Sequence, residues 1–301
     1  MGPAPNFFTY HFERTINFPM RLIYDANDLS NAWKMKDDRF KWLCELGAVE
    51  LGEVQPEDQG FLFSYEHGPD HLTHQVGHLP RINDRPIERS ELINLNEVLS
   101  KLEEAGIQVP TPKTWVIGVD DELPSELSFP LFLRTPKSSW KRGGDQGKVR
   151  SLKEFVDEAE LLRRAFGWDT PIIARQWLDI ATAGTWMFGD APQEIRTWII
   201  DGQPIAWSFH YLHVVTSPTD FPPSSDDLME IQTMAKSVAL PFASRLIAAD
   251  FVRDIEGKWH FMEAGPGAIA GTAHEAVFKH VAMTLVGESS TLEADKVGGP
   301  F

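Results

Sequence analysis

The chain has 301 residues and a formal net charge of −16, which disfavours a protein that binds nucleic acid broadly, because such a charge repels phosphate backbones. Hydrophobic residues make up 42% and charged residues 24%, a composition that indicates a folded globular protein rather than a disordered or fibrous one. The sequence lacks an apolar run long enough to cross a bilayer, and its start, MGPAPNFF, lacks the pattern of a secretion signal, so we expect a cytoplasmic protein without a membrane partner.

The first third of the chain mixes short apolar runs, such as RLIYDA and FLFSYEH, with polar loops, and its topology cannot be read from the pattern. Cys44 is the only cysteine, which excludes an internal disulfide, and we expect it to be a small buried side chain. His71, His74 and His78 have spacings that could share a helix face, as in a zinc-dependent hydrolase. An acidic general base at the zinc-protease spacing is missing and Gly77 weakens the helix, so we interpret these histidines as surface or substrate-facing.

A helix is predicted next, in NLNEVLSKLEEAGIQVPTPKTWVI, with Asn96 as its N-cap and Gly106 as its left-handed stop. Its apolar positions recur at helical spacing, namely at Val98, Leu99 and Leu102. The segment that follows is extended and leads to the strand TWVI, so we expect a domain boundary near Pro110 to Lys113.

The stretch LFLRTPKSSWKRGGDQGKVRS, residues 131–151, places cations around Gly143 and Gly144 directly after a short apolar strand. Basic residues in a glycine-rich loop are often only a solvated connection. The alternative is a loop that wraps a small anion at close range, because paired glycines let backbone N–H groups approach a ligand. The flanking segments have to decide between the two.

Further along, Ser151 and Glu154 predict a capping box at the start of an amphipathic helix through Phe155 and Ala165, and PIIARQWL is typical of a buried strand. EIRTWII and PIAWSFHY flank Asp201–Gly202, a strong hairpin signal. SSDDLMEIQTMAKSVAL predicts a helix with acids in its first turn, and the end, GESSTLEADKVGGPF, is expected to be frayed.

Two apolar segments in LIAADFVRDIEGKWHFMEAGPG predict a second hairpin. We expect a tight turn at Glu256–Gly257 with Ile255 paired to Lys258, a register that puts Asp250 directly opposite Glu263. Opposed carboxylates destabilise a sheet, and a divalent cation would remove the conflict; oxygen ligands suit magnesium. The alternative is that both acids lie at a solvated sheet edge.

The segments GIQVPTP, FPLFLR with its basic loop, EIRTWIIDGQPI and DFVRDIEGKWHFMEAGPG resemble, in order and spacing, the ATP-grasp superfamily over about Asn94 to Thr284. Ordinary members have a strand-end lysine that touches ATP phosphate. Here Arg134 stands in that place and Lys141 follows in the loop, which resembles the clade with this exchange. The resemblance implies an α+β ATP-grasp fold, in which two α+β subdomains clasp ATP.

In this interpretation the chain has three parts. Residues 1–112 form an N-terminal α/β pre-ATP-grasp domain that contributes substrate contacts. Residues 113–286 form the ATP-grasp domain, with a lid subdomain at about 130–176, and residues 287–301 form a C-terminal tail.

The resemblance also implies roles for single residues. Arg134 and Lys141 would hold the nucleotide phosphates, with the backbone of Gly143 and Gly144 close by, and Arg196 would neutralise the transferring phosphoryl group.

The other implied contacts involve adenine, ribose and metal. The backbone of Gln176, Trp177 and Leu178 would contact adenine, and Asp179 is a candidate for the ribose hydroxyls. Mg²⁺ would be held by Asp250 and Glu263. Family members usually have an asparagine two residues after the glutamate, where this chain has Gly265, so the number of metals stays open; Asp254 or a water could substitute.

The implied activity is carboxylate activation: ATP phosphorylates a small-molecule or peptide carboxylate, and an amine or another nucleophile attacks the acylphosphate. No nucleophilic serine or cysteine motif competes with this interpretation. Two alternatives remain, a nucleotide-binding module that senses ATP without turnover and an RNA-end ligase that transfers a nucleotidyl group, which the acidic surface disfavours. His210, Tyr211 and His213 are candidates for facing the substrate.

Overall fold

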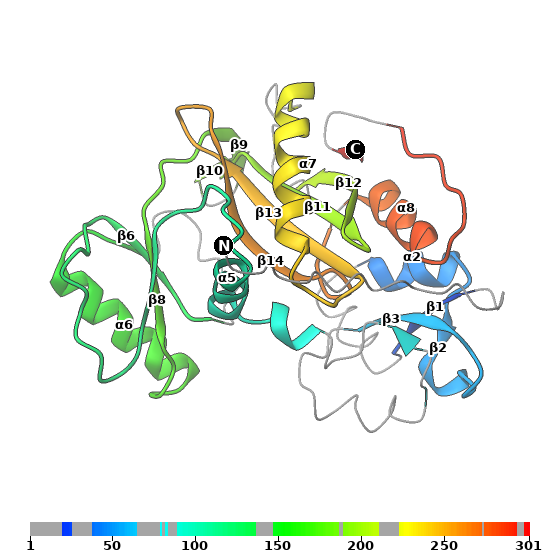
Figure 1. Cartoon of the computed structure of the whole chain (residues 1–301), viewed down its shortest axis with the longest axis horizontal. Coiled ribbons are helices and arrows are strands. Elements are labelled where there is room, and N and C mark those ends of the chain that lie inside the picture. The colour runs from blue at the N-terminus through cyan, green and yellow to red at the C-terminus, as the bar shows by residue number, and fades with distance from the viewer. Residues whose placement is uncertain are drawn as a thin grey trace, which may run out of the picture.

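The structure is a computed structural model that describes residues 20–25, 38–64, 79, 82–83, 89–136, 147–186, 189–210, 223–272, 274–293 and 298–301. Its described strands form three larger sheets and one two-stranded ribbon, with helices packed against the larger sheets (Figure 1). No helix in these ranges is long and apolar enough to cross a membrane.

The first sheet is parallel, with the order β2-β1-β3-β4. Its strands are β1 (Arg21–Tyr24), β2 (Val49–Glu50), β3 (Gly60–Phe63) and β4 (Ile82–Asn83), accompanied by α2 (Arg39–Glu45) and by 3₁₀ turns at Leu51–Glu53 and Ser90–Leu92. Helix α2 turns Phe40 and Leu43 into the core and leaves Cys44 on its outer face. The expectation that Cys44 is buried is therefore wrong, because the buried face of α2 is made by its aromatic and leucine side chains.

Helix α5 (Leu95–Glu104) begins earlier than the sequence pattern predicts. Its N-cap is Asn94 rather than Asn96, so the helix gains Leu95 as a further buried residue beside Val98 and Leu102. Gly106 ends it with a φ of 68°, as expected for a left-handed stop.

The second sheet, which we call the lid sheet, is antiparallel with the order β5-β8-β6-β7. Its strands are β5 (Thr114–Ile117), β6 (Leu131–Arg134), β7 (Lys148–Val149) and β8 (Ile172–Gln176). Helix α6 (Leu152–Phe166) packs on it through Phe155, Ala159 and Leu162. Ser151 caps α6 as expected, whereas the Glu154 carboxylate accepts from the N–H of Arg150 instead of closing a capping box.

The third sheet, the central sheet, is antiparallel with the order β14-β13-β11-β12-β15. Its strands are β11 (Glu194–Ile200), β12 (Gln203–Phe209), β13 (Leu246–Arg253), β14 (Trp259–Pro266) and β15 (Gly298–Pro300). Helices α5 and α7 (Ser225–Ala239) cover one face, and α8 (Glu275–Leu285) and α2 cover part of the other (Figure 1). The ribbon of β9 (Thr182–Trp186) and β10 (Gly189–Pro192) precedes it in the chain.

The turn between β11 and β12 confirms the first predicted hairpin. Asp201 and Gly202 have φ values of 49° and 76°, the left-handed pair that a two-residue turn of this kind requires. The capping box of α7 is also present, between Ser224 and Asp227, with the acids in the first turn that the sequence indicates.

The last residues do not form a frayed end. Strand β15 pairs with β12, with Gly298 opposite Ser208 and Pro300 opposite Ala206. A Cβ at Gly298 would come within 2.9 Å of the His274 ring, so a glycine is what allows this close pairing. The glycines that suggest disorder in the sequence therefore serve a close approach of the backbone.

Candidate functional site

Three polar side chains form a row across the central sheet. Arg196 on β11 pairs with Asp250 on β13, and Asp250 pairs with Glu263 on β14. Because residues directly opposite each other project from the same face of a sheet, all three share one face. Further along that face, Trp198 and Ala248 are buried under α8, so the row forms the polar part of the face.

Arg196 and Asp250 form a bidentate ion pair. Arg196 Nε donates to Asp250 Oδ1 at 2.8 Å and Nη2 donates to Oδ2 at 2.7 Å, while Nη1 donates to the carbonyl of Gly271 at 2.6 Å. Burial lowers the pKa of Arg196, but the charges of Asp250 and Glu263 raise it by more, so the net pKa is raised. The guanidinium therefore stays charged although Asp250 is 2% exposed.

Arg134 brings the lid sheet to the same place. It is the last residue of β6, and its Nη1 lies 2.5 Å from Glu263 Oε2. The structure therefore gathers four sequence-selected residues from four strands of two different sheets: Arg134, Arg196, Asp250 and Glu263.

The opposition of Asp250 and Glu263 is confirmed, but the turn that was expected to produce it is not. Asp254, not Ile255, pairs with Lys258, so the loop contains three residues and the register near the turn is shifted by one. A β-bulge at Met262 then shifts it back before Glu263. Two deviations from the simple hairpin cancel at the site.

The charge conflict between the two acids is resolved by arginines. Arg196 neutralises Asp250, and Arg134 neutralises Glu263. The argument that the register by itself demands a divalent cation is therefore wrong, because each carboxylate has a cationic partner. The carboxylates still have lone pairs beyond those used by the arginines, and their oxygen-only chemistry fits Mg²⁺.

Gly265 and Asp254 bear on the number of metal ligands. Gly265 supplies no side chain, and a Cβ built there would meet nothing within 4 Å. Asp254 lies in the turn, where its carboxylate accepts from the N–H groups of Glu256 and Lys258 and lies 2.7 Å from Nε2 of His260. Asp254 is thus used to shape the turn and does not substitute for the missing asparagine.

Arg175 was not selected from the sequence, although it holds the bulge. It lies on β8 and is 2% exposed, and its Nη1 donates to the carbonyl of Met262, the extra residue, at 2.7 Å. Its other nitrogens donate to the hydroxyls of Thr111 and Thr114 at 2.8 and 3.1 Å. Burial lowers the pKa of Arg175 to about 10, so it remains charged at neutral pH.

The segment expected to contact adenine continues directly from β8. The N–H of Gln176 donates to the carbonyl of Lys113 and that of Trp177 to Pro130, while Asp179 accepts the indole N–H of Trp177 at 2.9 Å. Leu178 is the member of the segment whose N–H has no backbone partner within the described ranges. A purine could therefore bond Leu178 more readily than Gln176 or Trp177.

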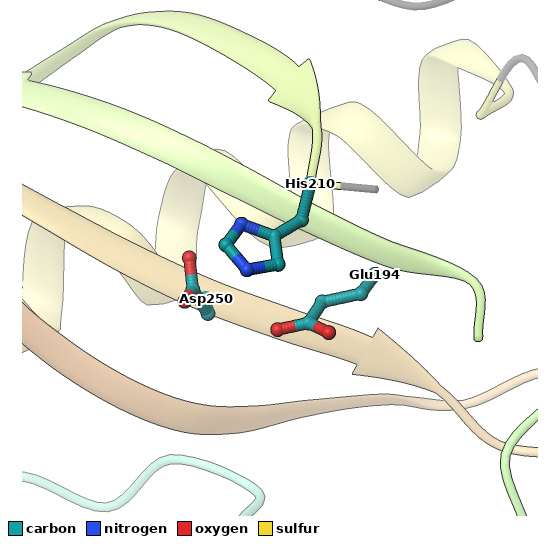
Figure 2. Close-up of side chains that lie close together, drawn as sticks. All are labelled: Glu194, His210 and Asp250. Carbon is teal, nitrogen blue, oxygen red and sulfur yellow. The ribbon is translucent and has the colours of Figure 1, made fainter. Parts of the chain in front are cut away.

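Three further side chains near these elements were missed. Lys148 on β7 stacks its Nζ 3.9 Å from the centroid of the Trp177 ring. Glu194 was overlooked, and His210 was noted without a role; both lie beside Asp250, and their side chains point toward one another in Figure 2. The strand register could have flagged Glu194, which is two residues from Arg196 and so on the same face.

Other expected residues lie outside the described ranges: Lys141, Gly143, Gly144, His71, His74, His78, Tyr211 and His213.

The fold matches that of several solved structures over most of their length. A D-alanine–D-alanine ligase from Bacillus anthracis superposes with a TM-score of 0.60 and 12% identity, over 89% of this chain and 97% of that chain. A RimK domain ATP-grasp protein from Sphaerobacter thermophilus gives 0.55 and 12%, over 89% and 98%. An L-amino acid ligase from Bacillus licheniformis gives 0.52 and 13%, over 88% and 70%. The protein therefore has the α+β ATP-grasp fold.

A family profile narrows this class. The profile describes an ATP-grasp domain, the third family of the clade that exchanges arginine and lysine, and it matches residues 124–285. Because this match covers more than half of the chain, the protein belongs to this family. The resemblance identified in the sequence, including the clade with arginine in place of lysine, is confirmed. No curated protein matches the chain in sequence.

Proposed function

We propose that the protein is an ATP-dependent carboxylate–amine ligase that releases ADP and phosphate. The observation that carries the proposal is the contact of Arg134 with Glu263 beside the Arg196–Asp250 pair. These residues combine two fixed cationic groups with two carboxylates at the junction of the lid sheet and the central sheet. Phosphoryl transfer needs this kind of positioned charge more than it needs a covalent nucleophile on the protein.

In the first step, a carboxylate oxygen of the substrate attacks the γ-phosphorus of ATP, and the bond from that phosphorus to the bridging oxygen breaks as ADP leaves. Arg134 binds the phosphate oxygens with its planar donors, and Arg196 offsets the charge that develops on the transferring group. The acylphosphate then loses phosphate when the amine nitrogen attacks its carbonyl carbon, forming the C–N bond, and the amine gives up a proton.

Mg²⁺ fits the carboxylate pair and would be held by Asp250 and Glu263. When bound, it would neutralise phosphate charge and help to orient the oxygens. Lys141, Gly143 and Gly144 would add to the phosphate contacts. The segment from Gln176 to Leu178 would contact adenine, and Asp179 would bind the ribose hydroxyls.

The substrate class is proposed from the relatives of the fold. The printed names of two neighbours, a D-alanine–D-alanine ligase and an L-amino acid ligase, describe enzymes that join amino acids. We therefore propose an acid–amino-acid or peptide ligase, with a small-molecule or peptide carboxylate as donor and an amine as acceptor.

The test is a magnesium-dependent ADP-release screen across amino acids and peptides. We expect Glu263→Ala to lower turnover to below about 1% of the wild-type rate, as loss of a group that stabilises transferring charge does. The matched control is Glu104→Ala, an exposed acid at the end of α5, which should leave turnover unchanged. Wild-type turnover in Glu263→Ala would reject Glu263 as a metal ligand, and release of AMP and pyrophosphate would indicate nucleotidyl transfer instead.

A second candidate is a module that binds ATP without turnover. It is favoured by the engagement of Asp250 and Glu263 with arginines and by the missing side chain at Gly265. Saturable ATP binding without ADP release for any acceptor would support this second function.

A further inference from the structure

Three strands bring Glu194, His210 and Asp250 to one spot on the polar face of the central sheet. Glu194 is the first residue of β11, and His210 directly follows β12. The N–H of His210 donates to the carbonyl of Glu194 at 3.0 Å, which continues the strand pairing by one residue. Asp250 pairs with Arg196, two residues along β11 from Glu194. All three side chains therefore project from the same face, as Figure 2 shows.

Their geometry is close to that of a metal-binding set. One ligand atom from each residue lies within 4.8 Å of the corresponding atoms of the other two. Ligands on opposite sides of a cation with bonds of about 2.1 Å are about 4.2 Å apart, so a small contraction of the side chains completes the set. Glu194 and Asp250 are 6% and 2% exposed, so they belong to a built pocket and not to a solvated acidic surface.

The local charge also favours a cation. Asp250, Glu263 and Glu194 carry three negative charges, and their fields all act on Arg196. Arg196 and Arg134 supply two positive charges, so these five residues together have a net charge of −1. Asp250 can accept from Arg196 and still bind a cation, because a carboxylate has about four lone-pair sites.

We infer that Glu194, His210 and Asp250 form a binding site for a divalent transition-metal cation of the Mn²⁺ and Zn²⁺ class. An imidazole nitrogen with two carboxylates suits these ions better than Mg²⁺ or Ca²⁺, which prefer oxygen ligands alone. The cation binds without nucleotide and lies beside Arg196, on the side of Asp250 away from Glu263 in the strand order. This goes beyond the proposed ligase activity, with which the site shares only Asp250.

The test uses the full-length chain, stripped of metal and free of nucleotide, and titrates it with Mn²⁺ followed by electron paramagnetic resonance. One equivalent should bind, with nuclear modulation from the imidazole nitrogen of His210. Mg²⁺ should compete only at more than about a tenfold excess, since it lacks affinity for the nitrogen ligand.

Two variants remove ligands of the proposed site, and one removes its neighbour. Glu194→Gln and His210→Ala should each weaken Mn²⁺ binding by more than about tenfold, the minimum expected for a direct ligand, and His210→Ala should lose the nitrogen modulation. The matched control is Glu263→Gln, which removes a nearby charge that is not a ligand here and should change affinity by less than about fivefold. Circular dichroism checks the folding of each variant, and Glu194→Gln, which preserves shape, stands if His210→Ala does not fold.

Wild-type Mn²⁺ affinity in folded Glu194→Gln and His210→Ala would overturn the inference. Loss of binding in Glu263→Gln alone would do the same, and would place the cation at the Asp250–Glu263 pair. Either result leaves the ligase proposal intact, since that proposal needs only this pair. Conversely, a protein that binds Mn²⁺ as expected but releases no ADP with any acceptor would contradict the ligase proposal and leave the metal site standing.

Discussion

Arg196 uses all three guanidinium nitrogens, two of them on Asp250 and one on the carbonyl of Gly271. A lysine has a single ammonium on a flexible stem and cannot reproduce the planar fork. Since Asp250 is buried, weakening the pair also leaves a carboxylate poorly compensated.

We expect Arg196→Lys to lower the rate of ADP release by about 100-fold or more, the usual effect of losing one positioned donor to a transferring group. Steady-state kinetics would separate kcat from KM, and the loss should lie mainly in kcat. Arg245→Lys is the matched control, because Arg245 forms the same bidentate pair with Asp201, but at an exposed turn. Equal losses in both variants would show that the effect comes from general stability and not from the site.

Asp254 gives a prediction that depends on pH. Burial raises its pKa, but hydrogen bonds from His260 and from the N–H groups of Lys258 and Glu256 lower it by more, so the pKa lies below the usual 3.8. The unfolded chain therefore binds a proton more readily, and the stabilisation is present above pH 3.8 and lost as the pH falls through the lower folded pKa.

Asp254→Asn should accordingly lower the free energy of unfolding at pH 7 by about 1.5–3 kcal/mol, the range for hydrogen bonds to a charged group. The difference from wild type should shrink below pH 3.8, as measured by urea unfolding at several pH values. Asp157→Asn, which removes an exposed acid paired with Lys153 on α6, should change stability by less than about 0.5 kcal/mol. A difference that grows in acid would contradict the assignment.

At the scale of elements, the β13–β14 hairpin shows what the sequence could and could not predict. The facing of Asp250 and Glu263 was predicted, yet from a two-residue turn that the chain does not have. The side chain of Asp254 accepts from two N–H groups of the loop and so stabilises a three-residue turn, and the bulge at Met262 restores the register. Such a bulge depends on Arg175, which comes from another sheet and lies 87 residues away in the chain.

The helices and the β11–β12 hairpin were predicted better because their signals are local. Ser224 with Asp227 and Asp201 with Gly202 act within a few residues of each other. The start of α5 was misplaced because Asn94 and Asn96 are both acceptable caps, and only tertiary packing of Leu95 selects the first.

Arg175→Met tests whether the bulge positions Glu263. Methionine keeps most of the side-chain volume but removes the donors to Met262, Thr111 and Thr114, so stability should fall by about 1–3 kcal/mol. Turnover should fall as well, and the affinity for Mg²⁺ with ATP should weaken, since a shift of about 1 Å at a reacting group is costly.

The matched control is Arg163→Met on α6. Arg163 also donates to carbonyl groups, those of Gly118 and Thr170, but touches neither β14 nor its bulge. It should lose stability without a change in the turnover of the folded fraction. If Arg175→Met behaves in the same way, Arg175 is a stabilising residue and has no role in positioning the site.

At the scale of the whole molecule, the site lies where the lid sheet meets the central sheet (Figure 1). The order of elements from Asn94 onward was predicted, because each has its own periodicity or turn. The N-terminal sheet was not, since its strands have only two to four residues and parallel pairing is decided by distant segments. Its buried Arg39 reaches the carbonyl of Ala270, close to the carbonyl that Arg196 uses, so this sheet helps to fix the loop after β14.

The central claim is that Arg134 of the lid sheet and the acids of the central sheet bind one magnesium nucleotide between them. The most direct test is a calorimetric titration of the wild type and of Arg134→Met with a non-hydrolysable ATP analogue in the presence of Mg²⁺. The wild type should bind one equivalent, and Arg134→Met should bind at least about tenfold more weakly, since it loses charge-assisted bonds to phosphate. Equal affinity in both proteins, or no saturable binding by the wild type, would contradict the account.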